Sequence, residues 1–282
     1  MKIQWYPGHM TKAIRMIGEN VKLVDAVLYL LDARAPHSCV NPDFEKLTEG
    51  KPTLYLLNKQ DLADPKKTSV WVRQFAGERT AARAVCGTDR SLKAAVVSDL
   101  TQLLREKLER NAAKGVRKPL RAMIIGVPNC GKSTVMNTLA GEKRAVTGDK
   151  PGVTKGKQWL RLDSGLELLD TPGTLWNAFP DQRVGRHLAY IGSINDDILD
   201  LNELALELIG ELKTLYPAEL AARYGVEVAG TPLEVYEAIC RRRGFLVRGG
   251  VVDYDRGAKA ILDDFRKKRI GAITLEMPED FS

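Results

Sequence analysis

The chain has little of what marks secreted, membrane-spanning or disulfide-stabilised proteins. Its 282 residues contain only four cysteines, which are widely scattered and include no C-x-x-C pair: Cys39, Cys86, Cys130 and Cys240. This scatter predicts reduced thiols rather than a disulfide framework or a metal cluster. No apolar run approaches the ~20 residues needed to span a bilayer, and the first residues lack the apolar core of a signal peptide. We therefore expect a cytoplasmic protein without a membrane partner.

Tandem repeats, low-complexity tracts and heptad patterns are also missing, whereas positive charge is in excess. The net charge is +7 and the sequence pI is about 9.2. Such an excess favours an anionic partner, with nucleic acid as the first candidate. The basic residues that we consider as phosphate contacts, each of which could instead lie on a solvated face, are Lys12, Arg15, Arg34, Arg241, Arg242, Arg243, Arg248, Arg266, Lys267, Lys268 and Arg269.

Four short apolar runs bounded by turn residues predict buried parallel strands. They cover residues 26–31, 53–57, 121–127 and 166–169. Helical patterns lie between them, at residues 101–110 and from Lys132 onward. This alternation predicts an α/β fold with a doubly wound, mostly parallel sheet. Ligands of such sheets bind outside the carboxyl ends of the strands.

The pattern changes after about Trp176. From Val184 onward apolar residues recur at helical spacing, as at Leu208 and Leu212, and no strand signal of similar strength follows. A chain of this length accommodates one domain of about 150–200 residues and a smaller one. We therefore predict an α/β domain over residues 1–178 and an all-α domain over residues 179–282.

A phosphate loop is predicted where one strand ends and a helix begins. Residues 126–133 have the pattern G-x-x-x-x-G-K-S. Lys132 would bridge the β- and γ-phosphates, a catalytic role, and Ser133 would ligate Mg²⁺. The alternative is a glycine-rich turn with a chance lysine. The residues predicted to surround the phosphates are Asn129, Cys130, Gly131, Lys132, Ser133 and Thr134.

Guanine is selected by a second motif, N-K-x-D, which follows another predicted strand. The carboxylate of Asp61 would accept hydrogen bonds from the N1–H and the amine of guanine, which adenine cannot supply. Asn58 would meet the other polar edge of the base, and the stem of Lys59 would cover its face. For the loop behind the guanine, we consider Cys86 and Gly87, which lack the usual Ser-Ala signature.

A third motif, Asp170-Thr171-Pro172-Gly173, also begins at a predicted strand end. Asp170 would hold Mg²⁺ through water, and the N–H of Gly173 would meet the γ-phosphate. Thr154 lies in a polar stretch between the second and third elements and would complete the Mg²⁺ shell as a catalytic switch residue; the alternative is a plain turn. These three motifs predict a GTPase, but its base-reading motif comes first, so the domain is circularly permuted.

The group that orients the attacking water is not evident. Many GTPases carry a glutamine directly after D-x-x-G, whereas this chain has Thr174 and then Leu175. The side-chain carbonyl of Asn129 could ligate a K⁺ ion beside the phosphates, where the ion would act like an arginine finger. Capping of the loop is the alternative role for Asn129.

With the permuted order, the N-terminal Trp5-Tyr6-Pro7-Gly8-His9-Met10 and Asp32-Ala33-Arg34-Ala35-Pro36, the chain resembles the circularly permuted GTPases of ribosome assembly. The resemblance runs nearly end to end. It implies GTP hydrolysis coupled to late maturation of the large (50S) ribosomal subunit, with the helical domain on rRNA. It also implies activation by K⁺ at Asn129, and His9 in place of the missing glutamine. The alternative for His9 is an rRNA or structural contact.

The expected cofactors are therefore GTP or GDP, Mg²⁺ and K⁺, and the expected partner is the large subunit, with a monomer off the ribosome. Our leading hypothesis is a molecular switch whose slow turnover the subunit stimulates. A second is an RNA-binding placeholder for which GTP is only an affinity ligand. A third is a GTPase subunit of an RNA-modifying complex, for which no catalytic cysteine or methyl-donor motif is present.

Overall fold

The computed structural model describes residue 3 and residues 8–115, 118–141, 158–162, 165–176, 178–179 and 181–281. Within these residues, six strands form one sheet in the order β3-β2-β1-β4-β6-β5, in which only β5 is antiparallel to its neighbour. The strands are β1 (Ala26–Asp32), β2 (Thr53–Asn58), β3 (Thr80–Ala84), β4 (Leu120–Ile125), β5 (Gln158–Arg161) and β6 (Leu166–Asp170). The predicted doubly wound, mostly parallel sheet is confirmed.

The central strands are apolar throughout because both faces of the sheet are covered. Every residue of β1 and of β6 is buried, which is the pattern expected of parallel strands between two helical layers. All four predicted strands are present. The two that apolarity did not predict, β3 and β5, lie at the edges of the sheet, where half-exposed residues dilute the signal.

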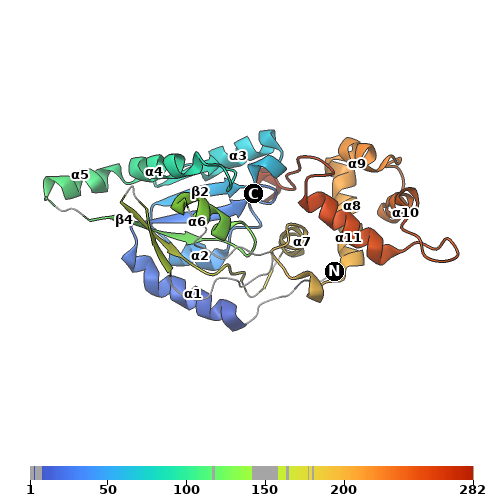
Figure 1. The fold of residues 1–282 in the computed structure, drawn as a ribbon, viewed down its shortest axis with the longest axis horizontal. Helices are drawn as coiled ribbons and strands as arrows, with labels where there is room; N and C mark the ends of the chain where they lie inside the picture. The colour runs from blue at the N-terminus through green and yellow to red at the C-terminus, as the bar shows by residue number, and fades with distance from the viewer. Residues whose placement is uncertain are drawn as a thin grey trace.

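Helices cover both faces of the sheet. Figure 1 shows α3 and α4 along one side and α1 along the opposite side. Their bounds are α1 (Gly8–Asn20), α2 (Pro42–Leu47), α3 (Pro65–Phe75), α4 (Leu92–Leu103), α5 (Arg105–Ala113) and α6 (Lys132–Ala140). The helical pattern predicted over residues 101–110 is confirmed, but it belongs to two helices, because the chain is interrupted at Leu104. Leu104 is buried with the core, whereas α5 has no buried residue and extends past the sheet (Figure 1).

Beyond the sheet the described chain is helical, as predicted. The α-helices are α7 (Gln182–Tyr190), α8 (Leu201–Leu215), α9 (Pro217–Tyr224), α10 (Pro232–Arg243) and α11 (Tyr254–Arg266). Short 3₁₀ turns are η1 (Val21–Leu23), η2 (Gln60–Leu62), η3 (Asp196–Ile198) and η4 (Pro278–Phe281). Buried leucines on one face of α8, including Leu204 and Leu208, pack it against its neighbours. No helix in the described part of the chain is long and apolar enough to cross a membrane.

The segment after α11 returns to the sheet, and the C-terminus lies beside β2 and α3 (Figure 1). The N–H of Ile273 donates to the carbonyl of Leu62 at 3.2 Å, and that of Leu275 donates to the carbonyl of Arg34 at 2.8 Å. These bonds attach the helical region to loops at the carboxyl ends of β1 and β2. The domain boundary at residues 178 and 179 stays a prediction.

A buried histidine holds this returning segment against α7 and α8. Nδ1 of His187 lies 2.7 Å from Glu276 Oε1, and Nε2 lies 2.8 Å from Glu211 Oε2. Ser38 also hydrogen-bonds Glu276, and all members except Glu211 are fully buried. Burial opposes the positive charge, but the bonds to the two carboxylates outweigh it and raise the pKa of His187 to about 9.

We expect replacement of His187 by glutamine to reduce the change in the free energy of unfolding between pH 6.5 and pH 9. Because the pKa of His187 is about 9 in the fold against an ordinary 6.5, its stabilisation is complete below about pH 6.5 and is lost towards pH 9. The wild type should exceed His187→Gln by on the order of 3 kcal/mol at pH 6, and by progressively less up to pH 9.5. Denaturant unfolding across this range measures the difference.

His37→Gln is the matched control. His37 is half-buried, and burial lowers its pKa below 6.5, so its charge does not change in the alkaline range where His187 loses its proton. The difference between wild type and this control should stay constant above pH 7. A constant difference for His187→Gln as well would show that the charge on His187 does not support the fold.

Candidate functional site

The three motifs meet at one edge of the sheet. Asn58 ends β2, Gly126 follows β4 and Asp170 ends β6, and these strands run in the same direction. The chain visits β1, β2 and β3 outward in one direction and then continues on the other side of β1 with β4. The edge beside β1 and β4 is therefore a topological switch point, where α/β sheets bind their ligands.

The phosphate loop has the backbone that its glycines permit. Gly126 has φ +155°, and a Cβ there would lie 2.4 Å from the carbonyl oxygen of Leu30. Only glycine therefore fits between the loop and β1. Nζ of Lys132 is buried and donates to the carbonyls of Gly126 at 2.9 Å and Val127 at 2.7 Å. The ammonium group is thus held inside the curve of the loop. Ser133 and Thr134 follow in the first turn of α6.

Asn58 joins the phosphate loop to the loop after β3. Its Nδ2 donates to the carbonyl of Cys130 at 2.8 Å, and its Oδ1 accepts from the N–H of Gly87 at 2.8 Å. Gly131 has φ +101°, and a Cβ there would lie 2.3 Å from Nδ2 of Asn58. Thr138 of α6 donates in turn to the carbonyl of Gly87 at 2.6 Å. The structure thus brings Gly87 to the site, while the contact of Asn58 with a base stays a prediction.

Lys59 and Asp61 stand at the open side of this arrangement. Lys59 has a left-handed φ of 59°, and its Nζ donates to the backbone carbonyl of Asn129 at 2.7 Å. The stem of Lys59 therefore crosses from the base-reading loop to the phosphate loop. Asp61 is exposed, so its carboxylate is accessible to a ligand. The thiol of Cys86 lies 3.2 Å from the hydroxyl of Thr88.

The D-T-P-G segment touches the phosphate loop. A Cβ on Gly173 would lie 2.7 Å from Nζ of Lys132 and 2.9 Å from Cα of Pro128, so the two segments approach as closely as a glycine allows. Asp170 is buried at the end of β6. Thr174 and Leu175 are also buried, and the N–H of Leu175 lies 3.4 Å from the sulfur of Met10 in α1.

Comparison with known proteins finds GTPases, in agreement with this arrangement of motifs. The family described as "50S ribosome-binding GTPase" matches residues 121–214. "Ribosome biogenesis GTPase A" of Priestia megaterium is 44% identical over 99% of this chain and 98% of its own, and that of Bacillus pumilus is 41% identical over 99% and 100%. The chain belongs to the ribosome biogenesis GTPase A family. The namesake from Thermotoga maritima is 34% identical over 99% of this chain and 96% of its own.

Solved structures agree with the assignment to this GTPase family. The GDP-bound structure of YlqF superposes with a TM-score of 0.65 at 27% identity, covering 94% of this chain and all of the other. The GNP-bound YlqF from T. maritima gives 0.64 at 28% identity, covering 95% and 99%. The expected fold, a permuted GTPase sheet with a helical C-terminal region, is therefore confirmed, and so is the expected enzyme class.

One further residue of this GTPase, Asp32, belongs to the site and was quoted in the sequence only as part of the resemblance to the family. Asp32 is fully buried, and its carboxylate accepts from Arg34 at 2.9 and 2.7 Å and from Lys59 at 3.0 Å. Burial would raise the pKa of Asp32, but the two cations keep it well below its usual range. The useful signal was its position, since Asp32 ends β1 at the same sheet edge as Asn58.

Arg34 was predicted as an RNA phosphate contact, which is wrong. Its side chain is 2% exposed, and its guanidinium donates hydrogen bonds to Asp32 and to the backbone carbonyl of Arg266. Arg266 is likewise bonded to Asp196. Two predicted site residues cannot be placed: Thr154 lies outside the described residues, and so does the side chain of His9, whose backbone forms the second residue of α1.

The donor set at this edge suits Mg²⁺ when nucleotide phosphates complete it. Mg²⁺ prefers oxygen ligands and usually binds through one or two protein groups plus phosphates and waters. Ser133 and Asp170 supply a hydroxyl and a carboxylate next to the phosphate loop. Within the described ranges no group of three or more His, Cys, Asp or Glu side chains could hold a metal alone. We expect nucleotide phosphates and waters to complete the Mg²⁺ shell, as is usual for this ion.

We expect Asp61→Ala to weaken guanine nucleotide binding while leaving the fold intact. Asp61 is exposed, and the change removes two hydrogen bonds to a charged acceptor, so the affinity for GDP should fall roughly 100-fold. Preference for guanine over adenine nucleotides should fall with it. Calorimetric titration with GDP and ADP measures both.

Glu49→Ala provides the control, since it removes an exposed acidic residue at the opposite end of β2. It should bind GDP like the wild type. If Asp61→Ala keeps full discrimination against ADP, the base is selected elsewhere.

Proposed function

We propose that this GTPase binds the maturing large ribosomal subunit and couples GTP hydrolysis to a late assembly step that the subunit stimulates. The names of its relatives and of the matching family support the ribosomal partner. The observation that carries the proposal is the meeting of three loops, far apart in the sequence, around Lys132. In the permuted order, the segment that senses the γ-phosphate continues directly into α7 and the helical region.

Each loop has a role in this proposal. Asp61 selects guanine, with Lys59 covering the face of the base and Gly87 behind it. Backbone N–H groups of residues 129–133 and the N-terminus of α6 surround the phosphates. Ser133, Asp170 and Thr154 hold Mg²⁺, which neutralises charge on the β- and γ-phosphates. Asn129 offers its side-chain carbonyl to K⁺.

The contact between Met10 and Leu175 supports a role for the N-terminal helix in hydrolysis. It places the start of α1 against the segment that follows Gly173. Thr174 and Leu175 are buried and cannot orient a water molecule. His9, which precedes Met10, would then position the attacking water once the N-terminal segment is ordered on rRNA. Intrinsic turnover is accordingly slow in this proposal, and the subunit accelerates it.

We expect His9→Ala to abolish most of the stimulation by large subunits. A positioned general base or water-orienting group contributes on the order of 100-fold, so stimulated turnover should fall by about that factor while GDP affinity stays unchanged. The measurement is steady-state GTP turnover with and without immature large subunits, in K⁺ and in Na⁺. Thr11→Ala, an exposed neighbour on α1, serves as the control.

Undiminished stimulation of His9→Ala would remove His9 from the catalytic group. Equal turnover in K⁺ and Na⁺ would show that Asn129 does not bind an activating K⁺ ion. If Lys132→Ala binds no nucleotide and yet supports subunit assembly, the protein is an RNA-binding placeholder rather than a switch.

A further inference from the structure

Asn129 of the phosphate loop is held from two sides. Its backbone carbonyl accepts from Nζ of Lys59 at 2.7 Å, and its side-chain Nδ2 donates to the carbonyl of Gly192 at 2.7 Å. The second bond fixes which way the amide faces. Asn129 also has φ +57°, a left-handed conformation that a residue other than glycine keeps only when its surroundings impose it.

Gly192 belongs to a turn that also holds Pro128. This turn, residues 191–193, directly follows α7. Ser193 is fully buried, and its Oγ donates to the carbonyl of Pro128 at 2.7 Å, while its N–H donates to the carbonyl of Leu188 at 2.8 Å. Two consecutive residues of the phosphate loop are therefore bonded to two consecutive residues at the end of α7.

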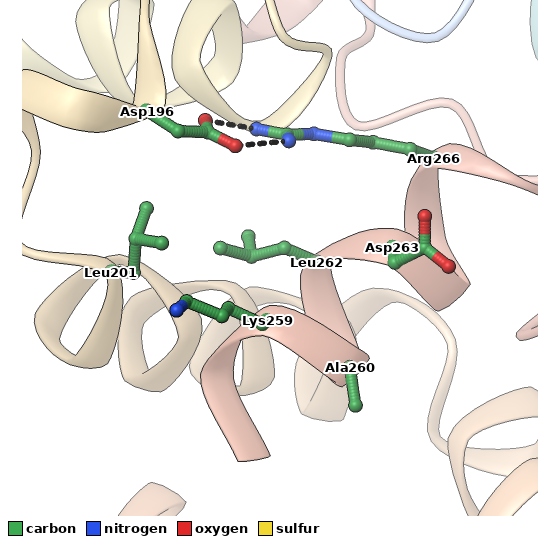
Figure 2. Close-up of a pocket in the computed structure, with 7 residues that line it drawn as sticks. All are labelled: Asp196, Leu201, Lys259, Ala260, Leu262, Asp263 and Arg266. Atoms are coloured by element: carbon green, nitrogen blue, oxygen red, sulfur yellow. Dashed lines mark hydrogen bonds and ion pairs between the residues drawn. The ribbon is translucent and has the colours of Figure 1, made fainter. Parts of the chain in front are cut away.

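Arg266, the last residue of α11, fixes the position of this turn. Its Nε and Nη2 donate to the carbonyls of Tyr190 and Ala189, both at 2.9 Å. Its guanidinium also forms a two-pronged pair with Asp196, at 2.7 and 2.8 Å. Figure 2 shows this pair facing Leu201 and Leu262 across a cleft between α8 and α11. A planar group with several fixed donors can meet all these partners at once, which lysine cannot do.

A second route leads from Arg266 to the other side of Asn129. Nη1 of Arg34 donates to the backbone carbonyl of Arg266 at 3.2 Å, and the guanidinium lies 5.5 Å from the ring centre of Phe265. Arg34 then pairs with Asp32, which pairs with Lys59. Both bonds that hold Asn129 are thus connected to the end of α11, one through the turn and one through buried charges.

We propose that Arg266 and the turn at residues 191–193 position Asn129, so that the end of α11 controls the geometry of the phosphate loop. This proposal rests on the proposed role of residues 126–133 in phosphate binding. A displacement of α11 withdraws the turn from Asn129, and binding of phosphate at the loop restrains α11 in return. Ser193 and Arg266 act through Asn129 and do not touch nucleotide.

Arg266→Gln and Ser193→Ala test this positioning in the full-length protein without ribosomal subunits. In the nucleotide-free state, amide hydrogen exchange over residues 126–133 should be faster in both variants than in the wild type. The value of kcat for GTP should fall about tenfold with KM changed much less, because a misplaced group near the phosphates affects the transition state more than binding. The double variant should be no slower than Arg266→Gln alone, since both changes release the same turn.

Arg269→Gln is the matched control, because it removes an equal charge from the same segment, and among the described residues Arg269 forms ion pairs only with Asp263 and Asp264. It should exchange over residues 126–133 and turn over GTP like the wild type. The proposal is overturned if Arg266→Gln matches this control in exchange, if exchange rises without a fall in kcat, or if the losses in kcat add. Ser193→Ala keeps the test decisive if Arg266→Gln does not fold.

These readouts are independent of the ribosomal partner. If subunits fail to stimulate turnover but the variants behave as expected, the ribosomal function fails and the positioning stands. If nucleotide binding does not slow exchange over residues 126–133 even in the wild type, the proposed phosphate site itself is at fault.

Discussion

A single buried side chain, the amide of Asn58, holds together loops that are distant in the sequence. Its two polar atoms are matched by the carbonyl of Cys130 and the N–H of Gly87. Both partners are buried or nearly so, and a buried amide left unpaired is costly. The register of β1, β2 and β4 places Asn58 where both bonds form together. Order in the site therefore begins with strand pairing, which sets the spacing of the loops before any ligand is present.

The parts of the site that lie at strand ends were predictable from the sequence. Apolar runs located β1, β2, β4 and β6, and parallel strands bring their carboxyl ends to one edge. The loop motifs that contain Asn58, Lys132 and Gly173 could therefore be predicted to lie together from the sequence alone. The edge strands β3 and β5 were not predicted, because half-exposed strands lack a continuous apolar run. The interruption at Leu104 was not predicted, because the helical spacing of apolar residues continues across this position.

Contacts between distant segments could not be predicted in this way. Arg34 looked like a surface cation because one arginine resembles another in a sequence, and only the fold shows Asp32 beside it. A buried carboxylate stays ionised when cations surround it, and Arg34 and Lys59 both lower the pKa of Asp32. The roles of Ser193 and Arg266 depend on the position of α7 and α11 relative to the phosphate loop, which no local pattern specifies.

The segment at residues 273–276 has a consequence for how the protein is made. Thr274 donates to the carbonyl of Ala33, 241 positions earlier in the chain. During translation, the backbone groups at the ends of β1 and β2 thus remain in water until residues far downstream have been synthesised. Contacts between residues so far apart in the sequence form slowly. A nascent chain that stops short of residue 273 lacks these bonds, so the loops after β1 and β2 stay uncovered until the last tenth of the protein has left the ribosome.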